Sequence, residues 1–536
     1  MVNRPTPGHL FVVKGDVTKI KCDAWLCPTD DEFSVTSSFG PALGYRGRKK
    51  LSGHNWDGRN AVSYRPATNR SNVQPNDVRG KPLIVLGNVG RDIPQSEKQI
   101  EAHVNELLPV LTEFVQVAKL EVAPAGTRPR RLALPLIGTG RGGLAGAKGD
   151  VVKPLLKRLN ELALQEGVDF VLCTVRDVDW SAVQSVRSQA EWNLTALEER
   201  WAQDLASKAR SKSLVLFVGA GVGIDAGLPN WDQLLDDLCP DEMTKEDRDI
   251  LSRLDHRDYA TLIEQQVGGP RKLLERLRGI LGGLPYVGLS HALLASLGVE
   301  QSITTNYDDL FEKAHQSPLR PTEECITVIP YERVKEGQPW LLKLHGSIEH
   351  DIESARSSTS TAKPSIVLTR SDYMNLARER SALFGIVQAL LVTKHLLFVG
   401  YSLNDDNFHQ LVDDIRLAIG SGSRENGRML GTVLTVEKWP MADVWSDILN
   451  IRDLTTSQGP VGRQLLIFLD RLAHLSTPND AYLLDEDFRK LLKPDERRIA
   501  TALGRVQVTV KDILRKDSTN KTAQAVMTEL KRFGAR

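Results

Sequence analysis

The stretch Leu214–Trp231 reads LVLFVGAGVGIDAGLPNW, in which an apolar run passes directly into closely spaced glycines. This pattern is typical of a buried strand that enters a phosphate-binding turn. Gly219 and Gly221 would let the backbone turn tightly and approach a diphosphate, whose charge would face free N–H groups at the N-terminus of the next helix. Ordinary tight turns also combine a strand with two glycines, so the pattern taken alone leaves both interpretations open.

The overall composition restricts the classes of protein to consider. The 536 residues are long enough for about three or four domains. The 69 basic and 68 acidic residues give a net charge of +1, which provides no general attraction to nucleic acid or membranes. The longest apolar runs are strand-sized and no N-terminal signal region is found, so we expect a cytoplasmic protein without a membrane span. The five cysteines lack the spacing of a disulfide framework, which favours reduced thiols: Cys22, Cys27, Cys173, Cys239 and Cys325.

Residues 1–187 alternate between strand-like and helix-like patterns, which predicts a three-layer α/β domain. One helix is expected over Ile100–Leu120, where apolar residues recur at helical spacing. The strands are expected at the short apolar runs Leu10–Val13, Ala24–Cys27, Leu83–Leu86, Leu132–Ile137 and Asp169–Val175.

A second α/β domain is expected over residues 213–450, after a linker helix over residues 188–212. Its charged segment from Trp231 to Leu297 reads as largely helical, and Gly298 stands where a helix C-terminal glycine would sit. Further strands are expected at Ser302–Thr305, Trp340–Leu344, His395–Val399 and Thr432–Val436. Residues 350–365 read as a surface loop and Ile366–Leu368 as a short strand, whereas residues 451–536 read as a helical C-terminal region whose last helix is capped by Asp517–Thr519.

Polar side chains follow three of these strands directly. Asn306 and Asp308 follow the first, His345 the second, and Gly400–Ser402 the third. Because ligands of open parallel sheets bind outside the carboxyl ends of the strands, we expect these residues to converge on the glycine turn at Gly219. Each residue also has an ordinary structural interpretation, since Asn and Asp often cap helices and a His before Gly is common in turns.

The run from Gly219 to Trp231 resembles the nucleotide-binding motif of the sirtuin (SIR2) family. The matching positions are Gly219, Ala220, Gly221, Ala226, Gly227 and Pro229, with Trp231 in place of the usual Phe. Two positions depart from the family pattern, because Gly223 replaces the usual Ser and Asp232 replaces the Arg of deacylating sirtuins. The resemblance is therefore strongest to the bacterial SIR2-like NAD hydrolases of antiphage defence.

The resemblance also implies a role for each strand-end residue. Asn306 would hold the ribose or a water molecule, Asp308 the nicotinamide carboxamide, and His345 would be the catalytic base. Gly400 and Ser402 would contact the phosphates and ribose. It implies NAD as substrate, ADP-ribose and nicotinamide as products, a homo-oligomer, and a defence partner protein encoded nearby.

Residues 1–187 resemble a macro domain, the ADP-ribose-binding fold. The resemblance rests on Gly15-Asp16-Val17-Thr18, on Asp23-Ala24, and on the run LPLIGTGRGG at residues 134–143. It implies that Gly138, Thr139 and Gly140 cradle a diphosphate and that Asp16 accepts a hydrogen bond from adenine. The segment Cys27–Asp30 replaces the family's Asn-Ala-Ala-Asn, so we expect binding of ADP-ribose and not ADP-ribosyl hydrolysis, or else a purely structural domain.

Two other functions remain open at this level. The first is an NAD-dependent protein deacylase, and the second is a non-catalytic sensor that binds NAD or ADP-ribose. Deacylating sirtuins commonly hold zinc with two closely spaced cysteine pairs, whereas Cys239 and Cys325 stand far apart here, so no metal is expected. The basic end of the chain, Lys531, Arg532 and Arg536, reads as a solvated helix face, and no direct binding of nucleic acid is expected.

Overall fold

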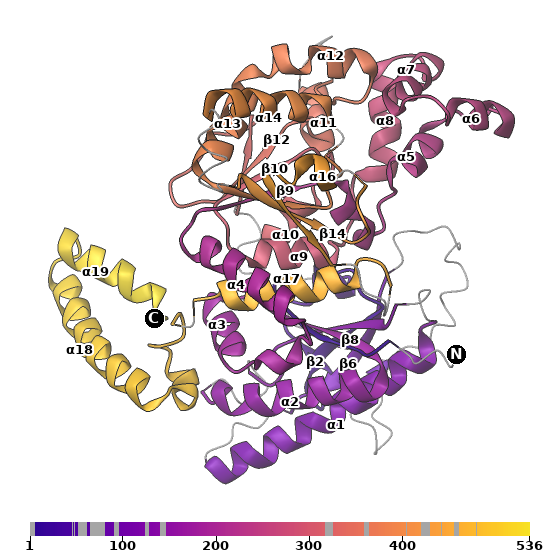
Figure 1. The fold of residues 1–536 in the computed structure, drawn as a ribbon. Helices are drawn as coiled ribbons and strands as arrows, with labels where there is room; N and C mark the ends of the chain where they lie inside the picture. The colour runs from indigo at the N-terminus through magenta and orange to yellow at the C-terminus, as the bar shows by residue number, and fades with distance from the viewer. Residues whose placement is uncertain are drawn as a thin grey trace.

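A computed structural model describes residues 6–45, 47, 49–51, 62–64, 81–90, 96–123, 128–139, 146–316, 325–357, 364–403, 405–419, 429–440, 442–454, 460–478 and 480–536. Two large β-sheets lie one above the other, with helices between them, and a helical hairpin stands to one side (Figure 1). Within the described part of the chain, no helix is long and apolar enough to cross a membrane.

The N-terminal half forms a six-stranded sheet that confirms all five predicted strands. The strand order is β1 (Leu10–Lys14), β8 (Val168–Thr174), β7 (Arg130–Pro135), β2 (Ala24–Thr29), β6 (Leu83–Asn88) and β5 (Val62–Tyr64). The first five strands are parallel and β5 is antiparallel to β6. Continuous apolar runs suit such strands, because a parallel sheet is covered on both faces.

Two long helices, α1 (Glu97–Glu121) and α2 (Lys148–Glu166), lie side by side against this sheet (Figure 1). The helix predicted over Ile100–Leu120 is thus confirmed as α1. Its buried positions recur every three or four residues and form one apolar face: Val104, Leu107, Leu111, Phe114 and Ala118. A shorter helix, α3 (Asp177–Ser185), packs on β1 and β8.

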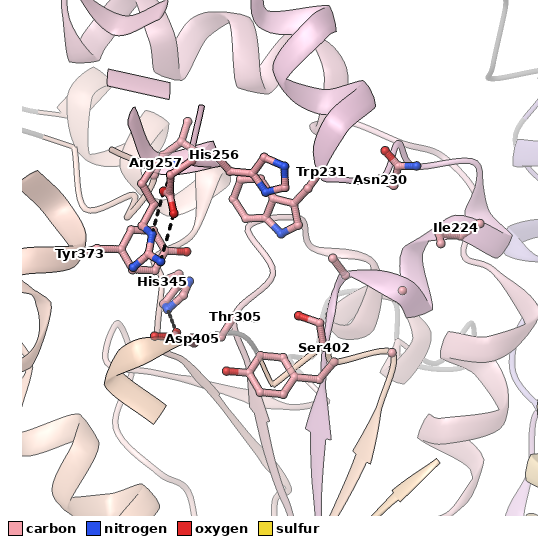
Figure 2. A pocket seen from close by; sticks show the side chains of 16 residues that line it. Ile224, Asn230, Trp231, His256, Arg257, Thr305, His345, Tyr373, Ser402 and Asp405 are labelled. Atoms are coloured by element: carbon pink, nitrogen blue, oxygen red, sulfur yellow. Dashed lines mark hydrogen bonds and ion pairs between the residues drawn. The ribbon is translucent and has the colours of Figure 1, made fainter. Parts of the chain in front are cut away.

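The C-terminal half forms a seven-stranded sheet in which every strand pairing is parallel. The order is β11 (Thr327–Ile329), β12 (Trp340–Lys343), β10 (Gln301–Thr304), β9 (Leu214–Val218), β13 (His395–Val399), β14 (Gly431–Thr435) and β15 (Leu449–Asp453). The chain builds outward from β9 in one direction and then crosses to β13 on the other side. The carboxyl ends of β9 and β13 are therefore a topological switch point, where a crevice opens (Figure 2).

Helices of the C-terminal half cover this sheet and its carboxyl edge. Four of them form a cluster: α5 (Trp231–Leu238), α6 (Lys245–Leu251), α7 (His256–Val267) and α8 (Pro270–Leu281). Buried residues of α5, α7 and α8 make up most of a separate hydrophobic core. Three others pack against one another: α12 (Arg370–Glu379), α13 (Ser381–Thr393) and α14 (Asp406–Ile419). Among them, α13 contacts β13. The short helix α16 (Ala442–Trp445) precedes β15.

Two local predictions in this half were wrong. The surface loop predicted over residues 350–365 begins instead as helix α11 (Ile348–Ser357). The strand predicted at Ile366–Leu368 is irregular backbone, because its partners are loops and not a neighbouring strand. Val367 donates its N–H to the carbonyl of His345, and its own carbonyl accepts from the Tyr307 hydroxyl at 2.6 Å.

Three helices fill the space between the two sheets (Figure 1). They are α4 (Ala196–Arg210), α9 (Leu289–Ser296) and α17 (Arg463–Ser476), and α17 packs on both of the others and on β1. Buried residues of β1, such as Leu10 and Val12, belong to the same hydrophobic core as Leu214 and Leu216 of β9. The two halves thus share one core, and a boundary at residue 187 does not isolate a unit with a core of its own.

The helical C-terminal region predicted over residues 451–536 begins inside this shared structure. The expected boundary at residue 450 falls within β15, and α17 is a core helix. Only α18 (Pro494–Lys516) and α19 (Lys521–Arg532) stand apart as a hairpin. The cap of α19 is Asn520, whose side chain accepts from Ala523 N at 2.9 Å, whereas Asp517 accepts from Thr519 in the preceding turn.

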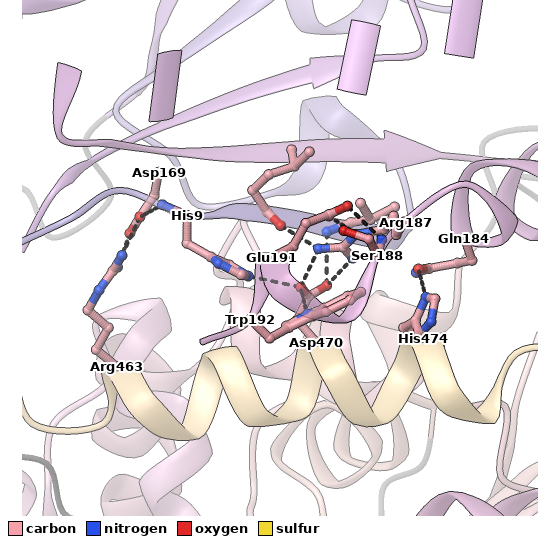
Figure 3. A network of polar contacts seen from close by, with 12 residues as sticks. His9, Asp169, Gln184, Arg187, Ser188, Glu191, Trp192, Arg463, Asp470 and His474 are labelled. Atoms are coloured by element: carbon pink, nitrogen blue, oxygen red, sulfur yellow. Dashed lines mark hydrogen bonds and ion pairs between the residues drawn. The ribbon is translucent and has the colours of Figure 1, made fainter. Parts of the chain in front are cut away.

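A buried carboxylate on α17 joins the shared layer to the first sheet (Figure 3). Asp470 is fully buried and accepts hydrogen bonds from the Arg187 guanidinium at 2.8 and 2.9 Å and from Trp192 Nε1 at 2.6 Å. Its carboxylate also accepts from Val12 N at 3.1 Å and lies 3.0 Å from His9 Nε2. Burial alone would raise the pKa of Asp470, but the charge of Arg187 and the contact with His9 hold this pKa well below its usual range.

Two more buried ion pairs hold α17 in place. Arg463 near the start of the helix binds Asp169 of β8, with one contact at 2.8 Å. Arg471 binds Glu199 of α4 at 2.6 Å. These charges explain why a helix rich in polar residues can be buried, since each charge is paired and hydrogen-bonded.

We predict that Asp470→Asn destabilises the protein by about 3–5 kcal/mol, because it removes the carboxylate that binds both ends of the buried Arg187 guanidinium and leaves Glu191, at 3.0 Å, as the remaining counter-ion. The folded-state pKa is depressed, so this contribution is complete above the unfolded-state pKa of about 3.9 and is lost as the pH falls further. Chemical denaturation at several pH values measures it. The difference in the free energy of unfolding between wild type and variant should be constant from neutral pH to about pH 4 and should become smaller below that pH.

The control is Asp241→Asn in the turn after α5, where the carboxylate is exposed and its neutralisation should leave the midpoint of denaturation unchanged. Equal midpoints for Asp470→Asn and wild type would contradict the role given to this carboxylate.

Candidate functional site

A cavity of about 550 Å³ lies at the switch point between β9 and β13 (Figure 2). This volume is within the range of ligand-binding pockets. Its wall contains residues from the turn after β9, from the ends of β10, β12 and β13, and from helices α5 and α7. Six of the residues predicted from the sequence line it: Ala220, Gly221, Trp231, His345, Gly400 and Ser402.

The turn after β9 and the turn after β13 fit into each other. Gly219 donates its N–H to Val399 O, and Gly221 donates its N–H to Gly400 O, both at 2.9 Å. A Cβ on Gly219 would stand 2.3 Å from Gly400 O, and one on Gly400 would stand 2.6 Å from Val222 N. Glycine is required here because the two backbones touch, and Gly400 in addition has a φ of 64°.

This geometry corrects one expectation for the glycine turn. The N–H groups of Gly219 and Gly221 bond within the fold and are not free to face a diphosphate. The following helix is also a short 3₁₀ helix over Ala220–Ala226, not an α-helix. Gly227 ends this helix with a φ of 89° and does not line the cavity. Any phosphate contact must therefore come from other groups of the two turns.

The turn is also fastened to the N-terminal half. Asp225, within the same 3₁₀ helix, pairs with Arg131 of β7 at 2.8 Å and accepts from Leu289 N at 2.6 Å. Burial would raise the pKa of Asp225, but Arg131 and these backbone N–H groups lower it below its usual value. Nearby, the Lys21 N–H and Val287 carbonyl form a bridge between the halves.

His345 follows β12 and is buried to 4% exposure on the wall of the cavity. Its Nε2 atom lies 3.1 Å from Asp405 Oδ2, and the edge of its ring contacts Tyr373. Gly346 has a φ of 94°, and a Cβ there would stand 2.7 Å from Ser365 O. The glycine thus permits the turn that directs His345 into the site.

Asp405 is the acidic partner that the sequence did not single out, although it follows Gly400–Ser402 closely. Its side chain also accepts from Asn407 N at 2.9 Å at the start of α14. Burial would raise the pKa of Asp405, but the contact with His345 and this N–H lower it. A helix-capping position explains why it was missed, because Asp is common there for structural reasons. The backbone is also strained two residues before Asp405, because the buried Leu403 has a φ of 56°, a value that favours glycine.

Asn306 and Asp308 lie behind the main cavity, at a smaller hollow of about 50 Å³. Asn306 donates its side-chain N–H to Gly219 O at 3.2 Å, whereas its Oδ1 atom is buried without a hydrogen-bond partner. Asp308 Oδ1 accepts from Leu310 N at 3.0 Å, just before α10 (Leu310–His315), whose N-cap residue is Asp309. Pro229, Trp231 and Thr305 also line this hollow, and the last two border the main cavity too.

Burial of Asp308 has an electrostatic effect. It raises the pKa of this carboxyl group, although the neighbouring Lys343 ammonium opposes the shift. Lys343 itself is completely buried, donating to Asp308 O at 2.5 Å and to Glu312 Oε1 at 2.8 Å. The loop that carries Asn306 and Asp308 is therefore held from below by a buried cation.

Helices α5 and α7 form the far wall of the cavity (Figure 2). The rings of Trp231 and His256 are parallel to within 8°, with centroids 6.4 Å apart. His256 Nε2 lies 2.8 Å from Asp232, the residue that stands in place of the deacylase Arg. Arg257 pairs with Asp406 at 2.6 Å and so links α7 to α14. Sequence patterns gave no sign of these contacts, because they join distant segments.

The residues predicted to bind ADP-ribose lie at the other sheet. Asp16 follows β1, and its Oδ1 accepts from Thr18 N at 2.9 Å. Gly138 has a φ of 75° after β7, and Thr139 Oγ1 donates to Leu136 O at 2.7 Å. Gly140, with the rest of that glycine-rich turn, is outside the described residues.

We predict that Gly219→Ala lowers the melting temperature and opens the contact between the two turns, because the added Cβ would overlap Gly400 O. Gly279→Ala in α8 is the matched control, since nothing lies within 4 Å of a Cβ there and Ala is the better helix former. Thermal unfolding should therefore move in opposite directions in the two variants. A melting temperature unchanged by Gly219→Ala would show that the turns do not need to touch.

Comparisons with known proteins connect the chain to a family model and to several relatives. Residues 300–438 match the family model described as a SIR2-like domain, a range that includes Asn306, His345 and Asp405. The chain is 30% identical over 227 residues to the NAD(+) hydrolase ThsA of Enterococcus faecium, which covers 40% of this chain and 41% of that protein. It is 25% identical over 223 residues to the NAD(+) hydrolase ThsA of Acinetobacter baumannii (strain 532279), covering 41% and 43%.

A further relative is the Defense-associated sirtuin 2 of Bacillus subtilis, 23% identical over 219 residues that cover 40% of this chain and 20% of that protein. The chain thus spans less than half the length of these curated relatives. The SIR2-like match lies in the C-terminal half of the chain, and none of these matches names a macro domain.

Proposed function

We propose that this protein hydrolyses NAD to ADP-ribose and nicotinamide, and that it does so in bacterial antiphage defence by depleting NAD. The observation that carries the proposal is the buried His345–Asp405 pair at the switch-point cavity. A histidine and a carboxylate at this edge of a Rossmann-like sheet stand where such a fold binds nucleotides. The SIR2-like match of residues 300–438 and the similarity to NAD hydrolases support the choice of substrate.

The chemistry requires a base that works near neutral pH. Cleavage of the bond between ribose and nicotinamide builds positive charge on the ribose, and either a ribose hydroxyl or a water molecule must lose a proton. In our proposal His345 accepts this proton. Because Nε2 faces Asp405, the Nδ1 atom is the ring nitrogen left for the substrate. The ionised Asp405 holds the ring in place and stabilises the imidazolium that forms.

The small hollow beside the cavity is lined by groups that suit the leaving group. The unpartnered Oδ1 of Asn306 is an acceptor for a ribose hydroxyl or the attacking water. Asp308 uses Oδ1 to accept from Leu310 N and keeps Oδ2 for the carboxamide of nicotinamide. Trp231 and Thr305 border both spaces, so a substrate with its ribose before His345 would direct its nicotinamide towards the hollow. Gly400 and Ser402 would then contact the phosphates.

The decisive experiment is incubation of the purified protein with NAD and separation of the products. We expect ADP-ribose and nicotinamide without any acyl-peptide. Acylated ADP-ribose that forms only with an acyl-peptide would indicate a deacylase. NAD that stays intact would favour the non-catalytic sensor.

Variants test the assigned residues in the same assay. His345→Ala and Asn306→Ala should abolish nicotinamide release, and Asp405→Asn should lower kcat at least about 100-fold because the base loses its orienting charge. His350→Ala is the matched control, because His350 stacks on Tyr331 and does not line the cavity. Turnover retained in both His345→Ala and Asn306→Ala would refute the mechanism.

We also propose that the N-terminal half binds ADP-ribose as a macro-like domain. Asp16 and Gly138 each follow the carboxyl end of a strand, and only β8 separates those strands, so the two loops open at one sheet edge about 10 Å apart. The positive φ of Gly138 and the acidic side chain of Asp16 suit a diphosphate and an adenine amino group. The product of the second half would thus be a ligand of the first.

The full-length chain is needed to test this, because both halves share one core. We would saturate the catalytic cavity of His345→Ala with NAD and then titrate ADP-ribose by calorimetry. One further molecule should bind, and adding Asp16→Ala should weaken this binding at least about tenfold, through loss of a charge-assisted hydrogen bond. Absence of such binding at millimolar ADP-ribose would reduce this half to a structural role.

A further inference from the structure

Helix α18 carries an apolar stripe on the side turned away from the rest of the molecule. Ile499, Val506 and Ile513 are 53%, 43% and 39% exposed and stand at intervals of seven residues. Ala502 and Thr509 stand between them and are also exposed. This is the a and d spacing of a helix that packs along another helix. No described residue packs over the stripe in this chain.

The partner helix α19 covers the strip of α18 directly beside this stripe. Val510 packs with Ala523 and Met527 of α19, and Leu514 and Val526 lie at the margin of this small cluster. The stripe is therefore additional to the contact that forms the hairpin. Its exposure does not follow from the way in which the two helices fold together.

The hairpin is nevertheless fixed in position. The Arg536 guanidinium at the end of the chain pairs with Asp485 at 2.7 Å and with Asp487 at 2.5 Å. Leu484 donates its N–H to Phe533 O at 2.7 Å. These contacts tie the end of α19 to the segment that precedes α18, so the hairpin is held beside the rest of the molecule (Figure 1).

The composition of α18 indicates that it needs a packing partner. Of its 23 residues only Val510 is buried, although the helix contains Gly504 and the β-branched residues Val506, Val508 and Thr509. Glycine and β-branched residues are weak helix formers. Since helices in proteins gain most of their stability from packing of an apolar face, a second helix along the stripe would supply it.

We propose that the stripe of α18 pairs with the same stripe of a second copy of this chain, with the two helices antiparallel about a two-fold axis. The first turn carries Asp495 and Glu496, and the last turn carries Arg515 and Lys516. Antiparallel pairing places the acidic end of each helix beside the basic end of the other and opposes their dipoles. The small Ala502 and Thr509 side chains let the helices approach closely.

The position of Val506 makes the pairing testable. It is midway between Ile499 and Ile513, so in a two-fold pair it lies next to its own counterpart. Val506→Glu would place two like charges together and should weaken association roughly 100-fold. Val508→Glu is the matched control, because Val508 is the same residue type, is 61% exposed, and points to the opposite side of the helix.

Light scattering and sedimentation of the full-length chain measure the outcome. We expect the wild type and Val508→Glu to associate, and Val506→Glu to show a smaller mass. Wild-type protein that stays monomeric up to about 100 μM would overturn the proposal, since a specific interface should form there. A mass unchanged by Val506→Glu would overturn it as well, because association would then use another surface.

Oxidative cross-linking determines the orientation independently of stability. Val506→Cys should form a disulfide between copies, and Val508→Cys should not. In a mixture, Ile499→Cys should link to Ile513→Cys if the helices are antiparallel. Links of Ile499→Cys only to itself would show parallel helices and would contradict the two-fold antiparallel arrangement.

Discussion

The contact between two glycine turns is the constraint on which the site depends. At Gly219 and Gly400 the backbones after β9 and β13 touch, and the hydrogen bonds from Gly219 and Gly221 close the gap between them. A side chain at either position would force the strand ends apart. The cavity beside the turns, and the approach of Asp405 to His345 across it, rest on this close packing. The glycines thus shape the site chiefly through the fold, and only secondarily through contact with a ligand.

The same turn is coupled to the N-terminal half by a buried ion pair. Asp225 belongs to the 3₁₀ helix that follows Gly219, and Arg131 belongs to β7. Between the halves, α17 adds Asp470 with its bonds to Arg187 and Trp192. Buried charges of this kind give little net stability, but they are costly to separate. They therefore specify one relative placement of the two sheets, which a purely apolar layer would leave less defined.

Around the site, burial and charge act against each other. Burial raises the pKa of Asp308, although the nearby Lys343 ammonium opposes this shift. Asp405 is also buried, but the contact with His345 and an N–H bond from Asn407 lower its pKa. Two carboxyl groups near one cavity thus have opposite shifts, the pattern by which sites divide the work of acid and base among similar residues.

Much of the fold was determined by the sequence itself. Apolar runs that end in glycine or polar residues predicted β9, β10, β12 and β13, and the spacing of motifs placed His345 and Ser402 at one cavity. Such features are local, because a strand and the turn after it are encoded in consecutive residues. The expectation of free N–H groups at Gly219 failed, since the neighbouring turn that binds them is distant in the chain.

The tertiary structure alone decided what joins distant segments. The pairing of Asp405 with His345, the burial of α17 and the bond between Arg131 and Asp225 each connect residues that no local pattern relates. Asp405 also follows the rule for a helix cap, so its sequence context concealed its second contact. The amino-acid sequence specifies where strands, turns and chemical groups occur, but packing and charge pairing across the molecule decide which groups meet, because those energies depend on proximity in space and not along the chain.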